Sequence, residues 1–548
     1  MLQFAVFVLL IVMALPTSAF LLLQDDDIQN RVVSKVMQFV SDKLGTRFTV
    51  GSVDMAYLYR IRLNNVYLED LDGDTLIFSK SITAGIRYID PLRKSVSIGS
   101  INFDEAILNL VTDDEKGLNL NYFIDKLRGD GQKKGGAWTV DFHNLRLEES
   151  RFTLKNTNFA PIEYGMNYTD LAAYNINADI RRFKPSRDSL SFYIRSLNFK
   201  EQSGLTIENL TSRFSQSKTF LSFRKVRIKT PDSEIRGDDI TLKFKSFSAF
   251  KSGTFTDSVR LRVDLEKSLI SLVDLGYFSK VFRNYDQQLT FSGVVSGPVN
   301  NIRAKDISIA FGKSSIFKGT LQFEGLPDIR QTFILADIEQ LRTTAGDINA
   351  FELLQRRGIR MPEQLVKLGN INYTGNFTGF INDFVAYGQF NTGLGIISTD
   401  LLFRPDTSNQ LSFEGRMNVH DFDLGTLTDA SGKIGNISLS ATIDGATVQG
   451  KSINASLKGV IKQLDLMQYQ YTNISLSGDL NNKTFNGSVN VKDPNIDLEF
   501  LGKVDFSDSI PAFDFTTNIT DANLYALNIS KKDPDFRASF YLIAKVYG

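Results

Sequence analysis

The sequence predicts an all-β protein built as a long antiparallel meander with a few short helices. From about Arg47 onward, apolar residues recur at every second position, which places them on one face of a strand. The apolar runs are separated by Gly, Asn-Asn or Asp-Gly, which are residues of tight hairpin turns. Polar residues fill the alternate positions, and the 43 phenylalanines favour half-buried, pleated strands. We therefore expect a sheet with one dry face and one wet face.

The clearest alternation lies near the C-terminal end of the chain, and its apolar residues are our candidate functional residues. They are Ile437, Leu439, Ile443, Ile474, Leu476, Leu480, Ile496, Leu498, Phe500, Val504 and Phe506. A long sheet cannot leave its apolar face in water, so it must pack on a second sheet, close into barrels or curl. Curling gives an elongated, β-taco-like groove lined by these residues. The alternative is a series of β-sandwich domains in which the same residues fill the cores.

Residues 1–23 predict a transmembrane anchor. The run Leu2–Leu23 carries no charge, and as a helix it would span about 33 Å at roughly 1.5 Å per residue, enough to cross a bilayer. A signal peptide cleaved after Thr17–Ala19 is the alternative, because small residues precede the cut. The apolar run continues past that point, which favours a retained anchor. Residues 24–45 then predict an amphipathic helix that lies on the membrane or plugs the start of the β structure.

The rest of the chain shows one flexible stretch, Gly129–Gly136, which is rich in Gly and Lys. We therefore expect an N-terminal β region over 46–130 and a repetitive β-sheet over 137–548. Helical spacing of apolar residues predicts inserts near 265–282 and 347–368. Elsewhere hairpin follows hairpin, so we expect no crossover helix of the parallel-sheet kind.

The composition argues against nucleic-acid binding and against catalysis. Lys+Arg and Asp+Glu balance at 62 each, so no net field attracts a phosphate backbone. Cysteine is absent and the two histidines, His143 and His420, lie far apart in sequence. Thiolate chemistry and disulfides are therefore excluded, and nothing nominates a metal site or a catalytic relay. We expect no enzymatic activity, no cofactor and no metal.

Several short motifs carry a resemblance to a known family. They are Gly73–Leu76, Ile98–Ile101, Leu118–Asn121, Met361–Glu363, Leu368–Ile371, Gly375–Phe380 and Phe422–Gly425. The stretch Val66–Ile124, which contains the first three, resembles the N-terminal region of AsmA-like proteins. More narrowly, the chain is similar to the TamB-type envelope proteins of the Bacteroidetes group, over most of its length.

This resemblance implies a single-pass inner-membrane protein whose bulk lies in the periplasm and whose sheet curls into a long apolar groove. It implies carriage of phospholipid between the inner and outer membranes, with acyl chains held in the groove. The alternative function is a scaffold or holdase for outer-membrane protein assembly with a barrel partner. The chain stops in strand-like sequence, before the C-terminal β domain of that family, so we expect a C-terminally truncated member.

Overall fold

The computed structural model describes residues 26–56, 60–90, 92–93, 95–128, 139–159, 164–186, 188–250, 254–351, 366–405, 411–448, 452–505, 507, 510 and 512–546. All thirty strands among these residues belong to one largely antiparallel sheet, accompanied by few helices. The predicted all-β class and its meander are confirmed at this level. The predicted anchor (residues 1–23) and the predicted linker (129–136) lie outside the described residues. Within the described ranges, no helix is long and apolar enough to span a bilayer.

The chain divides into two compact units, and the first comprises the residues up to Ala249 together with Val263–Gln288. Its elements are α2 (Asp26–Leu44), β1 (Phe48–Thr49), β2 (Ser52–Ala56), β3 (Arg60–Glu69), β4 (Thr75–Asp90), β5 (Ser95–Asp104), β6 (Ile107–Asp113), β7 (Gly117–Leu118), α3 (Asn119–Arg128), β8 (Thr139–Asn156), β9 (Asp170–Pro185), β10 (Ser189–Glu201), β11 (Thr206–Ile207), β12 (Asn209–Ser217), β13 (Phe220–Lys229), β14 (Glu234–Lys243), η1 (Phe247–Phe250), α5 (Leu272–Phe278) and η2 (Lys280–Phe282). The strand β15 (Arg260–Ser271) begins in the second unit and continues in the first.

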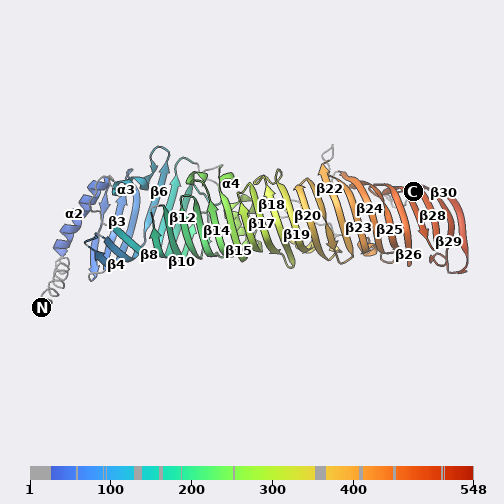
Figure 1. Ribbon diagram of the computed structural model, residues 1–548, viewed down its shortest axis with the longest axis horizontal. Helices are drawn as coiled ribbons and strands as arrows, with labels where there is room; N and C mark the ends of the chain where they lie inside the picture. Colours follow the sequence, from blue (N-terminus) through green and yellow to red (C-terminus); the bar gives the residue numbers. More distant parts are fainter. Residues whose placement is uncertain are drawn as a thin grey trace. The chain divides into compact units, whose positions relative to one another are not determined.

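The C-terminal half of α2 packs on the start of this sheet, beside the first strands in Figure 1. Leu44 joins Leu76 and Phe123 in a core whose exposed fractions are 4%, 0% and 2%. The Ser41 hydroxyl accepts a hydrogen bond from the backbone N–H of Phe48 at 3.0 Å, which fixes where the strand leaves the helix. Of the two placements expected for this helix, the structure shows packing on the β structure at these residues.

The expectation that no crossover helix occurs is wrong for the first unit. Both β5 and β6 pair in parallel with β8, and α3 lies on the connection that leads to β8. Parallel neighbours require such a crossover because the chain must return to the end of the sheet where it began. Phe123 anchors α3 in the same core as α2, so burial of one aromatic side chain favours this return.

The first of the two predicted helical inserts is shorter than expected. The first was placed at 265–282, but β15 extends to Ser271, and only α5 and η2 are helical. Pairing with β14 overrides the helical spacing, since the Ser268 hydroxyl both accepts from the Arg236 N–H and donates to its carbonyl. The second insert was placed at 347–368; the structure shows α6 (Ala345–Ala350), and residues 352–365 lie outside the described part.

The second unit comprises Phe250–Arg262 and Leu289–Gly548. Besides α6, its elements are α4 (Phe255–Ser258), β16 (Gln288–Gly297), β17 (Asn301–Phe311), β18 (Ser315–Glu324), β19 (Phe333–Thr344), β20 (Asn370–Phe380), β21 (Asp383–Asn391), β22 (Ile396–Pro405), β23 (Leu411–Asp423), α9 (Leu424–Leu427), β24 (Ile434–Val448), β25 (Ser452–Leu466), β26 (Tyr469–Asn481), β27 (Thr484–Asp493), β28 (Ile496–Asp505), β29 (Ala512–Asn523) and β30 (Arg537–Val546). From β16 to β30 each strand pairs antiparallel with the next, so the strands follow one another in chain order (Figure 1).

A buried aspartate ties α6 to the turn between β17 and β18. The Asp347 carboxylate, 6% exposed, accepts hydrogen bonds from the backbone N–H groups of Lys313 and Ser314 at 3.0 and 2.8 Å. The hydroxyls of Ser314 and Ser315 donate to the same carboxylate at 3.1 and 2.9 Å. In the first unit, Asp274 of α5 has the equivalent role. A short helix that could not be stable alone is thereby fixed to a neighbouring hairpin.

Asp274 is also buried, at 8% exposure, and it accepts hydrogen bonds from two hydroxyls of the turn between β13 and β14. Thr230 donates at 2.6 Å and Ser233 at 2.5 Å. In each unit, a buried carboxylate therefore joins a short helix to the turn of the hairpin that precedes it in the sheet.

We predict that Asp347→Asn destabilises the protein and weakens its acid sensitivity. Burial raises the pKa of Asp347, but the hydrogen bonds from Lys313, Ser314 and Ser315 outweigh it and lower the pKa to about 2. A carboxyl whose folded-state pKa lies below its unfolded value stabilises the fold above that unfolded value, and this contribution is lost as the pH falls. The variant should lose about 2 kcal/mol of unfolding free energy at neutral pH.

The measurement is urea unfolding followed by circular dichroism at a series of pH values between about 4 and 2, the unfolded and folded pKa values of the carboxyl. Asp337→Asn, at an exposed carboxylate on β19, is the matched control. Equal losses of unfolding free energy in the two variants would show that the buried Asp347 carboxylate makes no specific contribution.

Candidate functional site

The candidate site is the apolar face of β16–β30, where the antiparallel register aligns apolar residues into rows that cross the strands. We call the edge that carries α6, α9 and the turn 524–530 the insert edge, and the opposite one the hairpin edge. Row 1, nearest the insert edge, consists of Phe291, Ile309, Phe317, Leu341, Tyr373, Phe390, Ile397, Val419, Leu439, Ile461, Ile474, Val491, Leu498, Ile519 and Phe540, each paired with the next.

Three further rows follow toward the hairpin edge. Row 2 is Ile307, Gly319, Ile338, Gly375, Gly388, Thr399, Met417, Ala441, Gly459, Leu476, Val489, Phe500, Thr517 and Leu542. Row 3 is Val295, Ala304, Leu321, Ala336, Phe377, Ala386, Leu401, Gly415, Ile443, Leu457, Gly478, Gly487, Gly502, Phe515 and Ala544. Row 4 is Ile302, Phe323, Ile334, Gly379, Phe384, Phe403, Phe413, Gly445, Ala455, Leu480, Phe485, Val504, Phe513 and Val546.

None of the four rows contains a charged residue. Their polar side chains are Thr399, Thr517 and Tyr373, and the last two donate to carbonyls of the sheet itself, at 3.0 Å to Glu499 and 3.2 Å to Tyr387. With strands about 4.8 Å apart, row 1 crosses roughly 65 Å of sheet, and four alternate positions cover about 20 Å along each strand. The result is a broad, uninterrupted hydrocarbon surface.

Ten of the eleven candidate residues lie on this face, and Phe506 lies outside the described residues. Leu439, Ile474 and Leu498 fall in row 1; Leu476 and Phe500 in row 2; Ile443 in row 3; Leu480 and Val504 in row 4. Ile437 and Ile496 lie beyond row 1 at the insert edge, where both are 8% exposed. The alternation therefore identified one face correctly, while the binding role of these residues stays a prediction.

Inserts cover the apolar face along the insert edge. Leu424 and Leu427 of α9 pack on a cluster that contains Ile437, and Leu527 of the turn 524–530 is fully buried beside Ile474. Each insert begins with a capping side chain. The carboxylate of Asp423, for example, accepts from the Thr426 N–H at 2.8 Å. Asn523 and Thr344 cap the turn 524–530 and α6 in the same manner.

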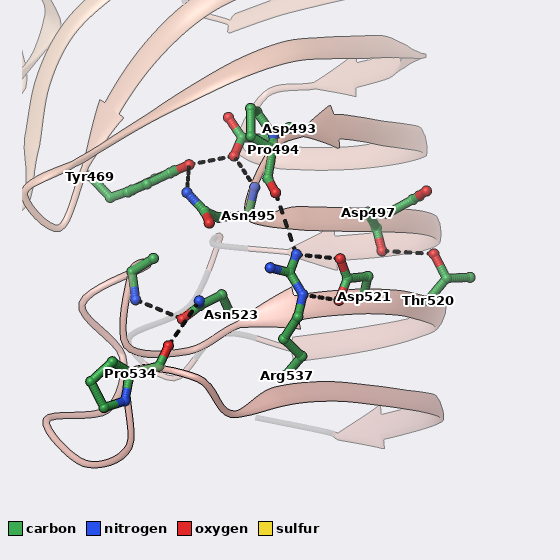
Figure 2. Close-up of polar contacts among 11 residues, drawn as sticks. Tyr469, Asp493, Pro494, Asn495, Asp497, Thr520, Asp521, Asn523, Pro534 and Arg537 are labelled. Atoms are coloured by element: carbon green, nitrogen blue, oxygen red, sulfur yellow. Dashed lines mark hydrogen bonds and ion pairs between the residues drawn. The ribbon is translucent and has the colours of Figure 1, made fainter.

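Figure 2 shows how the insert edge is held together near β30. The hydroxyl of Tyr469 donates to the carboxylate of Asp493, and the backbone N–H of Asn495 donates to the same carboxylate at 2.9 Å. Arg537 of β30 forms an ion pair with Asp521 of the neighbouring strand β29. Burial raises the pKa of Asp493, but the hydrogen bonds from Tyr469, Asn495 and Thr472 outweigh it and lower the pKa.

These polar groups bond to one another, so we interpret the cluster in Figure 2 as a structural contact that holds the strand ends together. Among the described residues, no group of three or more His, Cys, Asp or Glu side chains could hold a metal ion.

Burial falls from the insert edge toward the hairpin edge. Ile474, Val491 and Ile519 of row 1 are 5–9% exposed. In rows 2 to 4, every large apolar side chain except Ile307 is half-buried or exposed. A sandwich core would bury these positions almost completely, because a second sheet would lie on them.

Glycines on the apolar face lie where neighbouring strands approach closely. Gly415 and Gly502 have φ of +148° and +156°, a region that favours glycine, and a Cβ at either would lie 2.0 or 2.4 Å from a carbonyl of the neighbouring strand. Gly478 and Gly487 lie opposite each other beneath the ring of Phe485. Residues with a side chain would not fit at these positions without a shift of the neighbouring strand.

The opposite, wet face contains a separate hollow of about 860 Å³ over β21–β26. Its lining residues mix charges of both signs, and they include Asp400, Glu414, Arg416, Asp444, Lys458 and Asp479. Glu414 is already paired with Arg404 at 3.1 Å. Within the hollow, the Ser456 hydroxyl donates a hydrogen bond to the Asp479 carboxylate.

Comparison with known proteins returned nothing: no family model matches the chain, and neither a curated protein nor a solved structure matches it. Function must therefore be argued from the geometry.

The sequence reasoning missed the part of the apolar face that lies on β16–β23. Phe384, Ala386, Gly388 and Phe390 alternate on β21 as clearly as the chosen residues do. Glycines and alanines at facing positions weakened the pattern, although they belong to it. The same period of two, with Gly and Ala counted as they were in β24–β28, would have found these strands.

We predict that Gly415→Ala disrupts the sheet, because its new methyl would meet the Asp400 carbonyl and the residue would be held at an unfavourable φ. The expected loss is about 3 kcal/mol, typical of severe overpacking. Gly432→Ala is the control, since nothing lies within 4 Å of its Cβ position. Thermal unfolding of both variants is the measurement, and equal melting temperatures would contradict the requirement for glycine.

Proposed function

We propose that the apolar face of β16–β30 lines an open, curled groove that holds the acyl chains of phospholipid and carries them between the inner and outer membranes. The observation that supports this most is the set of four uncharged rows, of which rows 2 to 4 have large side chains that are half-buried or exposed, except for Ile307. Apolar surface of this extent on a folded protein implies a ligand or partner that covers it.

Acyl chains fit the chemistry of the rows. Burial of a methylene contributes about 0.8 kcal/mol, and the rows contain no charged group that would disfavour hydrocarbon. The rows repeat with little change from strand to strand, so neighbouring positions have similar affinity. A ligand bound along such a surface moves without leaving one deep site, which suits a conduit.

The curled form is supported by the glycines and by the inserts. Glycine in a strand interior permits local curvature that other residues resist, and Gly415 and Gly502 lie on the apolar face. The inserts close one edge of that face. Most of the completely described hairpins of the other edge are short, such as the two-residue turns Ile381–Asn382 and Asn482–Lys483, whereas the turn between β18 and β19 spans residues 325–332. Lipid would therefore enter from the hairpin edge.

The membrane location rests on the sequence. The uncharged run Leu2–Leu23 and the similarity to TamB-type proteins both favour an inner-membrane anchor with the sheet in the periplasm. A chain so placed would present its groove in the aqueous space that phospholipid must cross.

A scaffold or holdase for outer-membrane proteins is the second candidate. It is favoured by β30, which among the described strands pairs with β29 and exposes apolar residues on both faces. Leu542 is 43% exposed on one face, and Tyr541 and Ile543 are 64% and 69% exposed on the other. A client strand of a barrel protein could add to such an edge by main-chain hydrogen bonds.

Site-specific photo-crosslinking in a Gram-negative envelope separates the two candidates. A benzophenone amino acid is placed at Leu476 or Phe500 on the apolar face, or at their neighbours Ser477 or Leu501 on the wet face. We expect phospholipid adducts, detected by radiolabelled phosphate, at the first pair and none at the second, because adjacent strand residues point to opposite faces.

Protein adducts at both positions, or at β30 without lipid adducts anywhere, would favour the scaffold and overturn lipid carriage. Adducts of equal yield on both faces would show adventitious contact with membrane.

A charge on the apolar face should also stop binding. We predict that Leu476→Asp lowers the yield of lipid adduct at Phe500 at least tenfold, because a carboxylate beside an acyl chain is strongly disfavoured. Ser477→Asp on the wet face should leave the yield unchanged. The circular dichroism spectra and melting temperatures of both variants show whether the sheet is intact, and an unchanged yield in a folded Leu476→Asp protein would argue against the groove.

A further inference from the structure

A cluster of arginines lies on the wet face of β12–β14 in the first unit. Arg213, Arg224, Arg227 and Arg236 are all exposed. The register sets Arg213 directly opposite Arg224, and Arg227 directly opposite Arg236. Like charges opposite one another in an antiparallel pair destabilise it, since their Cβ atoms are about 4.5–5.5 Å apart. Two such pairs on three consecutive strands concentrate positive charge on this part of the wet face.

Acidic neighbours compensate part of this charge. Glu234 pairs with Arg236 on the same strand, and the hydrogen bond and charge of Arg236 together with the charge of Arg227 lower the pKa of Glu234. Glu266 of β15 also interacts with Arg236. Asp239 lies opposite Arg224, and its carboxylate accepts from the Thr241 hydroxyl at 2.6 Å. The structure shows no ion pair within the described residues for the other three arginines. Nearby lysines already have partners: Lys225 pairs with Asp238, and Lys229 with Glu208.

The backbone beneath the cluster is held in place by the other face of the sheet. Phe192, Phe214 and Phe223 form a ladder with ring centroids 4.7 and 5.0 Å apart. Arg213 and Arg224 are the chain neighbours of two of these rings, so their side chains leave the sheet on the opposite side. A β-bulge at Ser212 keeps both Arg224 and Arg227 on the wet face, because Lys225 takes up the extra residue with φ of +51°.

We propose that these four arginines dock the wet face of β12–β14 on an anionic phospholipid bilayer. Guanidinium groups bind phosphate through two parallel N–H donors and stay charged at every physiological pH. The cluster stands on an exposed strand surface rather than in an enclosed site. A single free phosphate would meet few donors there, whereas a layer of headgroup phosphates meets all four arginines together. This inference concerns a different unit and face from the groove, so it does not rest on the proposed function.

The test is flotation of the full chain with vesicles of equal parts phosphatidylglycerol and phosphatidylcholine, or of phosphatidylcholine alone. The combined variant Arg213→Ser, Arg224→Ser and Arg227→Ser should bind anionic vesicles on the order of a hundredfold more weakly, at about fivefold per arginine. The same three positions changed to Lys should retain most of the binding, because docking depends on charge. Binding should also weaken as salt is raised.

The matched control removes three exposed cations from the wet face of the second unit, by Arg416→Ser, Lys458→Ser and Lys462→Ser. Equal losses in the serine variant and the control would overturn the proposal, because net charge alone would then explain binding. Titration with inorganic pyrophosphate tests whether a free phosphate is the ligand. The proposal would also be overturned if the protein bound pyrophosphate tightly, lost that binding in the lysine variant, and bound anionic and neutral vesicles equally. If the protein dimerises in low salt and only the arginine-to-serine variant stays monomeric, the arginines bind a second copy of the chain, and the proposal is wrong. Unchanged melting temperatures confirm that each variant is folded.

Discussion

The antiparallel register of β16–β30 is the constraint on which the candidate site depends. Side chains alternate between faces, so one slipped residue on any strand would place charges among the apolar rows and break the hydrocarbon surface. The register is kept over fifteen strands although bulges occur on several of them. The bulges lie between rows 1 and 3 or on the insert side of row 1. The apolar residues on either side of each bulge remain paired across the strands.

Control of the strand ends follows from that constraint. Short helices and turns occupy the insert edge at α6, α9 and 524–530, and each is capped by a Thr, Asp or Asn side chain. Buried carboxylates such as Asp347 then fix an insert to a hairpin two strands away. An insert of four to seven residues has little stability of its own, so these polar contacts decide where its apolar side chains lie. They rest on row 1, which is why burial is deepest there.

The two faces of the sheet can therefore serve different purposes. On the dry face, bulky and small residues alternate across strands, and aromatic rings lie over glycine, as Phe485 does over Gly478 and Gly487. On the wet face, most charges pair locally, and the arginines of β12–β14 stand out because the register sets like charges together. A single layer exposes both faces along its length, whereas a sandwich would bury one of them.

The sequence by itself determined the fold class and which face is apolar. Alternation is a local property, and a period of two assigns Leu476 and Ser477 to opposite sides whatever the neighbouring strands do. Only the tertiary structure decided which strands pair and how the rows line up. The parallel pairing of β8 with β5 and β6 depends on α3 packing against α2, and β15 is a strand because β14 lies beside it. Those contacts join residues distant in sequence, and no local pattern records them. The exposure of rows 2 to 4 likewise depends on where the inserts of the second unit pack, and a local pattern does not determine that packing.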